Sequence, residues 1–280
     1  MLSILIIGIF LALFLAALVY TKKERSISDH ILGGLFLLYA LNIVLSYIEV
    51  YNRQNGYPWP GFIHAATPLL MLHGPALWFY IKSLTDQQFR FRPLYALHFL
   101  PFVLVVLEHT IHFYSLPVDE KIEVAASFSF RDHWAYTAVV IGIAVSQVGY
   151  FAWGLLIVQR YRRKIKTYFS HLDPFSLNWL RQLLIAAVIC YGIIHSLYLT
   201  DLFYRVAPFG MLQLISYSIG SVYIVLLGFF GLRQGNLFDS RKISLNLEDA
   251  VSEQEEEKAP ETEEEGFIRH LQEYMKKEKP

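Results

Sequence analysis

Long hydrophobic stretches separated by short polar segments occur seven times along the chain. Each stretch is long enough for an α-helix to cross a bilayer core, which takes about 20 mostly apolar residues. The stretches are Leu2–Tyr20, Ile31–Tyr51, Gly61–Ser83, Pro93–Tyr114, His133–Val158, Asn178–Leu202 and Gly210–Leu232. The first has no basic residues before it and no small-residue cleavage site after it, so we expect it to be retained. The pattern predicts an all-α, polytopic membrane protein folded as a bundle of seven transmembrane helices.

Basic residues are concentrated in alternate loops of this predicted bundle. The first, third and fifth loops, with Arg181 and Arg233, hold 13 Lys and Arg, whereas the other loops hold four. Basic loops stay in the cytoplasm, so we expect the N-terminus outside, the C-terminus in the cytoplasm, and a multi-pass protein of the inner (plasma) membrane. The topology anchors are Lys22, Lys23, Arg25, Arg90, Arg92, Arg160, Arg162, Arg163 and Lys164.

The composition excludes an ordinary soluble domain. Hydrophobic residues make up 55% of the chain and charged residues 17%, whereas soluble domains carry about 25% charged residues. The formal net charge of zero conceals two regions, because residues 1–235 carry 17 Lys and Arg against 11 Asp and Glu, and residues 236–280 carry 7 against 13. The one cysteine, Cys190, excludes a disulfide framework and a zinc site made of cysteines.

These patterns divide the chain into three parts. Residues 1–235 form the seven-helix transmembrane domain. Residues 236–265 are an acidic cytoplasmic linker, in which ten of the eighteen residues from Glu248 to Glu265 are acidic and which cannot bury enough apolar surface to fold. In residues 266–280 hydrophobic positions return at helical spacing, and we interpret them as an amphipathic helix that begins a truncated cytoplasmic domain.

Ionisable residues near the outer ends of the predicted helices are candidates for a site, because they are costly in a membrane. His109 and His112 share a helix face, so with a carboxylate from another helix they could bind a divalent metal or sense external pH. We favour the alternative that they are helix-end residues bonded to water or to each other, and we assign no metal. His64, His195 and Asp201 lie near the same level.

Two deeper polar residues, His73 and Gln147, are candidates for the lining of a ligand pocket. For His73 we favour a structural alternative, in which it satisfies carbonyl groups freed by Pro75. No zinc-protease, hydrolase or phosphate-loop motif occurs in the chain. The seventh stretch also has no lysine that could hold a retinal Schiff base. We therefore expect no enzyme activity and no cofactor.

Several short motifs occur in a familiar order. The third stretch reads Leu-His-Gly74-Pro75-Ala-Leu-Trp-Phe-Tyr, and His98 and Pro101 follow in Leu-His-Phe-Leu-Pro-Phe. Trp179 and Arg181 open the sixth stretch, Gly231 lies near the end of the seventh, and the chain finishes on Tyr-Met-Lys-Lys-Glu-Lys-Pro. Over essentially its whole length the chain resembles the heptahelical N-terminal region of membrane-bound AraC-type transcriptional regulators.

The resemblance implies a membrane sensor domain that controls a cytoplasmic helix-turn-helix output. The DNA-binding domain of the family is missing from the sequence, so we expect no direct nucleic-acid binding by this chain. The expected partners are the lipid bilayer and an unidentified extracytoplasmic ligand. A homodimer is a further alternative, suggested by small residues at Ala138, Gly142 and Ser146, although we favour packing inside the bundle for these. The alternative functions are a small-molecule transporter, an uncharacterised membrane enzyme, or a protein that only recruits a partner.

Overall fold

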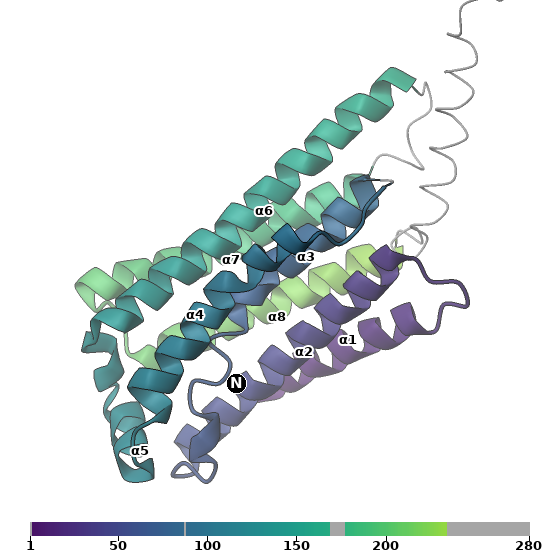
Figure 1. Ribbon diagram of the computed structural model, residues 1–280. Helices are drawn as coiled ribbons and strands as arrows, with labels where there is room; N and C mark the ends of the chain where they lie inside the picture. The colour runs from purple at the N-terminus through teal and green to yellow at the C-terminus, as the bar shows by residue number, and fades with distance from the viewer. Residues whose placement is uncertain (1, 87, 169–176, 234–280) are drawn as a thin grey trace, which may run out of the picture.

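The structure is a computed structural model that describes residues 2–86, 88–168 and 177–233, and within these residues the regular elements are all helices (Figure 1). The α-helices are α1 (Leu2–Tyr20), α2 (Ile27–Gln54), α3 (Leu70–Thr85), α4 (Leu100–His109), α5 (Val118–Ser127), α6 (Trp134–Tyr168), α7 (Asn178–Tyr204) and α8 (Phe209–Arg233). Short helices η1 (Pro60–Phe62), η2 (Pro93–Phe99), η3 (Thr110–Tyr114, a π-helix) and η4 (Ser129–Asp132) connect them. The expected linker and amphipathic helix, residues 236–280, lie outside the described residues.

Six of the helical segments are long and apolar enough to cross a membrane, which indicates a multi-pass membrane protein. These segments are Leu2–Tyr20, Ile27–Gln54, Pro93–Tyr114, Trp134–Lys164, Asn178–Tyr204 and Phe209–Leu226. The third of them is continuous through η2, α4 and η3. They correspond to six of the seven predicted stretches, and their helical form satisfies every backbone polar group without water.

The remaining stretch was predicted wrongly at its beginning. The helix starts at Leu70 instead of Gly61, and α3 has 16 residues. Pro60 and Pro68 disfavour helical conformation in the residue before each of them, and His64 has a left-handed φ of 61°. The side-chain amide of Asn42 donates to the carbonyl oxygen of Ala66 (2.8 Å) and fixes the irregular segment against α2.

The helices form a closed ring. In order around it, α1 packs against α2, α2 against α3, α3 against α6, α6 against α7, α7 against α8, and α8 against α1 (Figure 1). By contrast, α4 lies outside the ring against α3 and α6, and several of its large apolar side chains are exposed, as expected of a helix surrounded by lipid. The exposed side chains of this segment include Leu94, Leu97, Leu104, Leu107 and Ile111.

Two glycines allow α3 and α6 to approach each other. A Cβ atom at Gly74 would lie 2.8 Å from Cδ2 of Tyr150, which is closer than real contacts allow. A Cβ atom at Gly142 would lie 3.1 Å from Cε of Met71. Gly142 therefore contributes to packing inside the bundle, the reading that the small-residue pattern favoured. Pro75 is accommodated within α3 itself.

The half of the ring toward the α1–α2 loop, which we call the inner half by its place in the ring, is tightly packed. Its core is continuous over α1, α2, α3, α6, α7 and α8. Fully buried members of this inner core include Leu15, Leu35, Phe36, Ile81, Phe151, Leu180, Leu184 and Tyr223. Dense packing of this kind leaves no space for a ligand or a water column.

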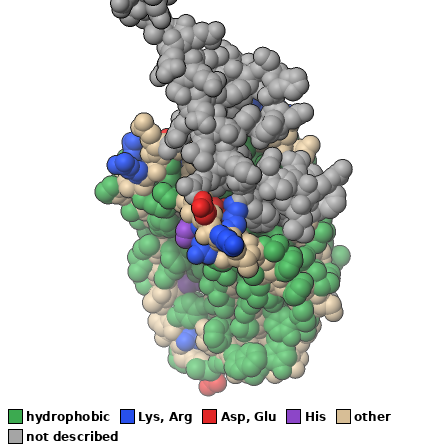
Figure 2. All heavy atoms as spheres, turned by 90° about the vertical axis from the view of Figure 1, so that its right-hand side faces the viewer, with side chains coloured by type: hydrophobic (Ala, Val, Ile, Leu, Met, Phe, Trp, Pro, Cys, Tyr) green, Lys and Arg blue, Asp and Glu red, His purple; other side chains and the backbone are tan. Residues whose placement is uncertain are grey.

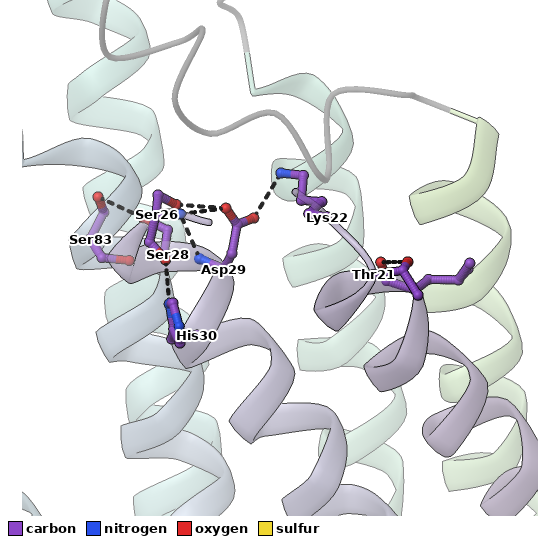
Figure 3. A network of polar contacts seen from close by, with 8 residues as sticks. Thr21, Lys22, Ser26, Ser28, Asp29, His30 and Ser83 are labelled. Atoms are coloured by element: carbon purple, nitrogen blue, oxygen red, sulfur yellow. Dashed lines mark hydrogen bonds and ion pairs between the residues drawn. The ribbon is translucent and has the colours of Figure 1, made fainter. Parts of the chain in front are cut away.

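A polar network fixes the α1–α2 loop at this inner end (Figure 3). The hydroxyl of Ser26 caps α2 by accepting from the backbone N–H of Asp29 (3.2 Å), and Oδ2 of Asp29 accepts from the N–H of Ser26 (2.8 Å). Nζ of Lys22 lies 2.9 Å from Oδ1 of Asp29. The hydroxyl of Ser28 donates to the carbonyl oxygen of Ser83 (3.1 Å), which ties the loop to the end of α3.

The predicted topology anchors follow α1, precede the apolar crossing segment Pro93–Tyr114, or lie in the last turns of α6, and these three places are at the same end of the ring (Figure 1). In Figure 2 lysine and arginine side chains gather above a broad hydrophobic surface. The described side chains at this end include Lys22, Lys23, Arg25, Arg90, Arg92, Arg160, Arg162, Arg163 and Lys164.

Candidate functional site

A cavity of about 480 Å³ occupies the half of the ring opposite the inner core, which we call the outer half. It lies among α2, α3, α6, α7 and α8, and the end of α4 forms part of its mouth. Its volume is within the range of pockets that bind small molecules, roughly 300–1,000 Å³. Because the exposed residues His112 and His133 are part of its lining, the cavity reaches the surface at this outer end.

The structure brings most of the sequence-predicted site residues together at this cavity. Six of the seven line it, although they come from five different helices (α3, α4, η3, α6 and α7) and the segment before α3. These residues are His64, His73, His109, His112, Gln147 and His195.

At the deep end of the cavity, α3, α6 and α7 are joined by hydrogen bonds. Nε2 of Gln147 donates to the carbonyl oxygen of Leu70 (2.9 Å), and Oε1 of Gln147 lies 2.9 Å from Nε2 of His195. The amide of Gln147 is therefore satisfied on both sides, so Gln147 and His195 form a rigid polar wall.

His73 on α3 differs from this wall because neither of its ring nitrogens has a hydrogen-bond partner, although the residue is only 2% exposed. Its ring packs edge-on against Tyr39, with centroids 4.6 Å apart. The expectation that His73 satisfies carbonyls freed by Pro75 is therefore wrong. A buried donor and acceptor without partners are costly, and His73 is one of the residues that line the cavity.

Midway along the cavity, several polar side chains lie close to the carboxylate of Glu49 on α2. Its Oε1 accepts from Nε2 of Gln213 (2.8 Å) and lies 3.5 Å from Nη2 of Arg53 and 3.9 Å from Nδ1 of His64. The amide oxygen of Gln213 and Nε2 of His64 are buried without partners. A ligand in the cavity would find both donor and acceptor groups here.

His64 lies outside the crossing segments, between α2 and α3, and its surroundings favour its neutral form. Burial lowers the pKa of His64 most strongly, and the positive charge of Arg53 and the nearby His109 also lower it. The carboxylates of Glu49 and Glu108 act in the opposite direction. Since burial is the larger effect, the neutral ring is the form available for hydrogen bonding.

The mouth of the cavity is lined by histidines around one carboxylate. Nδ1 of His109 lies 2.5 Å from Oε2 of Glu108, and Nδ1 of His112 lies 3.6 Å from its Oε1. The ring of His112 also lies 5.3 Å from that of His133, measured between centroids. Within residues 2–86, 88–168 and 177–233, no group of three or more His, Cys, Asp or Glu is arranged to hold a metal ion. His109 and His112 both make their polar contact with Glu108.

Asp201 is the one predicted site residue that does not line the cavity. It is 1% exposed and forms an ion pair with Arg131 of η4. Its Oδ1 also accepts from the backbone N–H of Ala207 (3.3 Å). Next to it, Arg205 bonds to Asp132 (2.6 Å). These contacts fasten the end of α7 to the segment before α6, so Asp201 holds the outer end of the bundle together.

The residues of the family-like motifs lie away from the cavity. Gly74 and Pro75 are buried in α3, and Nδ1 of His98 lies 2.5 Å from the hydroxyl of Tyr150. The others are Pro101 in the first turn of α4, Trp179 and Arg181 at the start of α7, and Gly231 in α8.

A stripe of polar residues along one face of α2 was not predicted to belong to the site. Tyr39, Asn42, Ser46 and Glu49 all line the cavity, and their spacing of three or four residues places them on one face of the helix. That spacing in an otherwise apolar helix was a detectable signal. Five tyrosines also line the cavity, and they were not singled out: Tyr39, Tyr136, Tyr191, Tyr198 and Tyr217.

Comparisons with protein-family models, with curated proteins and with solved structures gave no match to this chain.

Proposed function

We propose that this chain is the membrane-embedded sensor of a bacterial inner-membrane signalling protein, and that a small molecule entering from outside binds in the outer cavity. The observation that carries the proposal is a cavity of about 480 Å³ whose lining holds buried polar atoms without partners. Such atoms are costly unless something bonds to them. Binding at this place would be coupled to the ring of helices that surrounds it.

The proposal includes seven crossings, with α3 as the third. Its 16 residues extend over about 24 Å at 1.5 Å per residue. The irregular segment before α3 contains Ile63 and Ala66, which are buried, so protein surrounds its backbone where the chain enters α3. With seven crossings, the basic anchors place the N-terminus outside and the C-terminus in the cytoplasm.

The packing of the inner half favours a sensor over a transporter. A transporter must open its site to both sides of the membrane in turn. Here the cavity reaches the surface at the outer end, whereas Leu184, Phe151 and Tyr223 in the inner core are fully buried. A sensor requires only a change in helix packing, which passes along α7 and α8 toward the cytoplasm.

The output is proposed from the resemblance to membrane-bound AraC-type regulators. In this scheme residues 236–265 form an acidic linker, and residues 266–280 begin a cytoplasmic DNA-binding unit. The ligand would then alter the association of two copies, and through it transcription. DNA binding belongs to that output unit.

A cavity-filling substitution tests the proposal without knowledge of the ligand. A Cβ atom at Gly220, which lines the cavity, or at Gly149 on the outside of α6 would contact nothing within 4 Å. The chain is fused after Pro280 to a DNA-binding domain that acts only as a dimer, with a transcriptional reporter. Gly220→Phe should change reporter output by at least about fivefold, the lower end of common allosteric coupling, whereas Gly149→Phe should not. A Gly220→Phe protein that inserts normally and leaves the reporter unchanged contradicts the proposal.

A further inference from the structure

The charged side chains that line the cavity are of one sign. Glu49 of α2 and Glu108 of α4 contribute carboxylates, and among the described lining residues there is neither a lysine nor an arginine. A cavity with low-dielectric walls concentrates ions of the opposite sign. The lining therefore favours a cationic ligand over an anionic one.

The two carboxylates lie toward the same end of the cavity, and two histidines stand between them. Nδ1 of His64 is 3.9 Å from Oε1 of Glu49, the rings of His64 and His109 are 6.4 Å apart between centroids, and Nδ1 of His109 is 2.5 Å from Oε2 of Glu108. Nε2 of His64 is buried here and has no hydrogen-bond partner among the described residues.

Arg53 offsets part of this negative character. Its guanidinium lies 3.5 Å from Oε1 of Glu49, and it also stacks over the rings of Phe128 and Phe209, at 5.3 Å and 5.7 Å from their centroids. Arg53 is not part of the cavity lining. Among the described residues, those in ion-pair range of Glu108 are His109 and His112.

The rest of the lining suits the body of an organic molecule. Tyr136 and Tyr198 contribute aromatic rings, which attract cations and pack against apolar groups. At the deep end, His73 offers a donor and an acceptor that are both unpartnered. His73 contacts Tyr39, which is ten residues before Glu49 on α2, or about 15 Å along the helix axis.

We infer that the cavity binds a small organic cation, an amine whose charged group lies beside Glu49 and Glu108 and whose body extends toward His73. This inference rests on the proposed ligand-binding role of the cavity and adds the chemical class of the ligand. It makes the carboxylates, rather than the histidines, the determinants of charge selection.

The charge preference of the cavity can be measured with methanethiosulfonate reagents of different charge. Ser46 lines the cavity three residues before Glu49, so Ser46→Cys in a Cys190→Ala background places one thiol beside the carboxylates. The exposed Ser127 of α5, as Ser127→Cys in the same background, corrects for intrinsic reagent reactivity. Reaction rates with the ethylammonium and ethylsulfonate reagents are measured on the chain in lipid nanodiscs.

The expected result is a rate ratio of cationic to anionic reagent at Ser46→Cys that exceeds the ratio at Ser127→Cys by at least about tenfold, as field focusing predicts. Glu49→Gln and Glu108→Gln should each reduce this excess, and the pair should abolish it. Either single variant suffices if the double variant does not fold. Equal corrected ratios, or an excess that survives both substitutions, overturn the inference.

The same measurements separate this inference from the proposed function. If Gly220→Phe changes the reporter but the corrected rates show no preference for the cation, the cavity is a sensor site for a ligand of another charge. If the cation is preferred and Gly220→Phe leaves the reporter unchanged, the cavity binds cations without controlling an output. Failure of the neutral methyl reagent to react at Ser46→Cys overturns the inference, because the cavity is then closed.

Discussion

The outer and inner halves of the bundle are built from the same six ring helices but differ in what those helices enclose. In the outer half, α2 and α7 turn Glu49, His195 and other polar side chains toward a cavity of about 480 Å³. In the inner half the same helices turn Leu35 and Leu184 into a core without comparable space. One helix can therefore change from a packing element to the wall of a cavity within about three to four turns, and the composition along one face decides which it is.

The largest effect is expected where a charge is buried at the outer end. Arg131→Met removes the partner of Asp201, which is 1% exposed, and should lower the free energy of unfolding by about 3–5 kcal/mol because an unpaired charge remains. SDS titration of the purified chain measures it. The double variant Arg131→Met/Asp201→Leu should recover most of the loss. If the double variant is as unstable as Arg131→Met, packing of Arg131 rather than the unpaired charge explains the effect.

A matched pair of truncations on α7 compares the two halves directly. Leu184→Ala in the inner core should cost about 2–5 kcal/mol, because the fully buried site cannot collapse. Ile194→Ala at the cavity should cost less, since this side chain already faces open space. Both are measured by SDS titration. Equal losses would mean that the outer half is packed as densely as the inner half.

The contact between α3 and α6 gives a smaller effect. Gly74→Ala places a Cβ atom 2.8 Å from the ring of Tyr150 and should destabilise the bundle by about 1–3 kcal/mol through forced displacement. Gly149→Ala, where nothing lies within 4 Å, should be neutral or slightly stabilising. The thermal stabilities of the two variants are compared by heating each one and monitoring unfolding through the reaction of Cys190 with a fluorogenic thiol reagent. No difference between them would contradict the close packing.

The smallest effect concerns the pH dependence of stability at His64, beside Glu49. Because burial holds the pKa of His64 below its ordinary value of 6.5, the unfolded chain binds more protons than the folded chain in acid. The contribution of His64 to stability is therefore complete above that value and is lost as the pH falls. Unfolding midpoints at about pH 7.5 and pH 5.5 should differ less in His64→Phe than in wild type. An unchanged difference assigns the pH response to other groups.

The sequence predicted the helical class and six of the crossing segments, because apolar runs of this length have few other solutions in water or lipid. It failed at the start of α3, where Pro60, Pro68 and the left-handed His64 impose local geometry on an apolar stretch. The rule that polar residues in a membrane are functional candidates found His73 and Gln147, which line the cavity.

The same rule could not assign partners. Asp201 and His195 lie six residues apart on α7, yet one pairs with Arg131 and the other faces the cavity. Which of these occurs depends on the rotation of α7 against α6, and a single sequence carries no record of contacts between helices. Glu49 was not predicted as a site residue, although the spacing of the polar residues on α2 places them on one face of the helix.

Thiol labelling tests whether the outer half of the bundle is open and the inner half closed. In a Cys190→Ala background, cysteines replace Ser46 and Ser221 at the cavity and Ala187 in the inner core. The chain in nanodiscs, which expose both faces of the membrane, is treated with neutral methyl methanethiosulfonate, and labelling is measured by mass spectrometry. Ser46→Cys and Ser221→Cys should react, while Ala187→Cys should stay protected until the bundle unfolds. Protection of Ser46→Cys and Ser221→Cys equal to that of Ala187→Cys would contradict an open outer half.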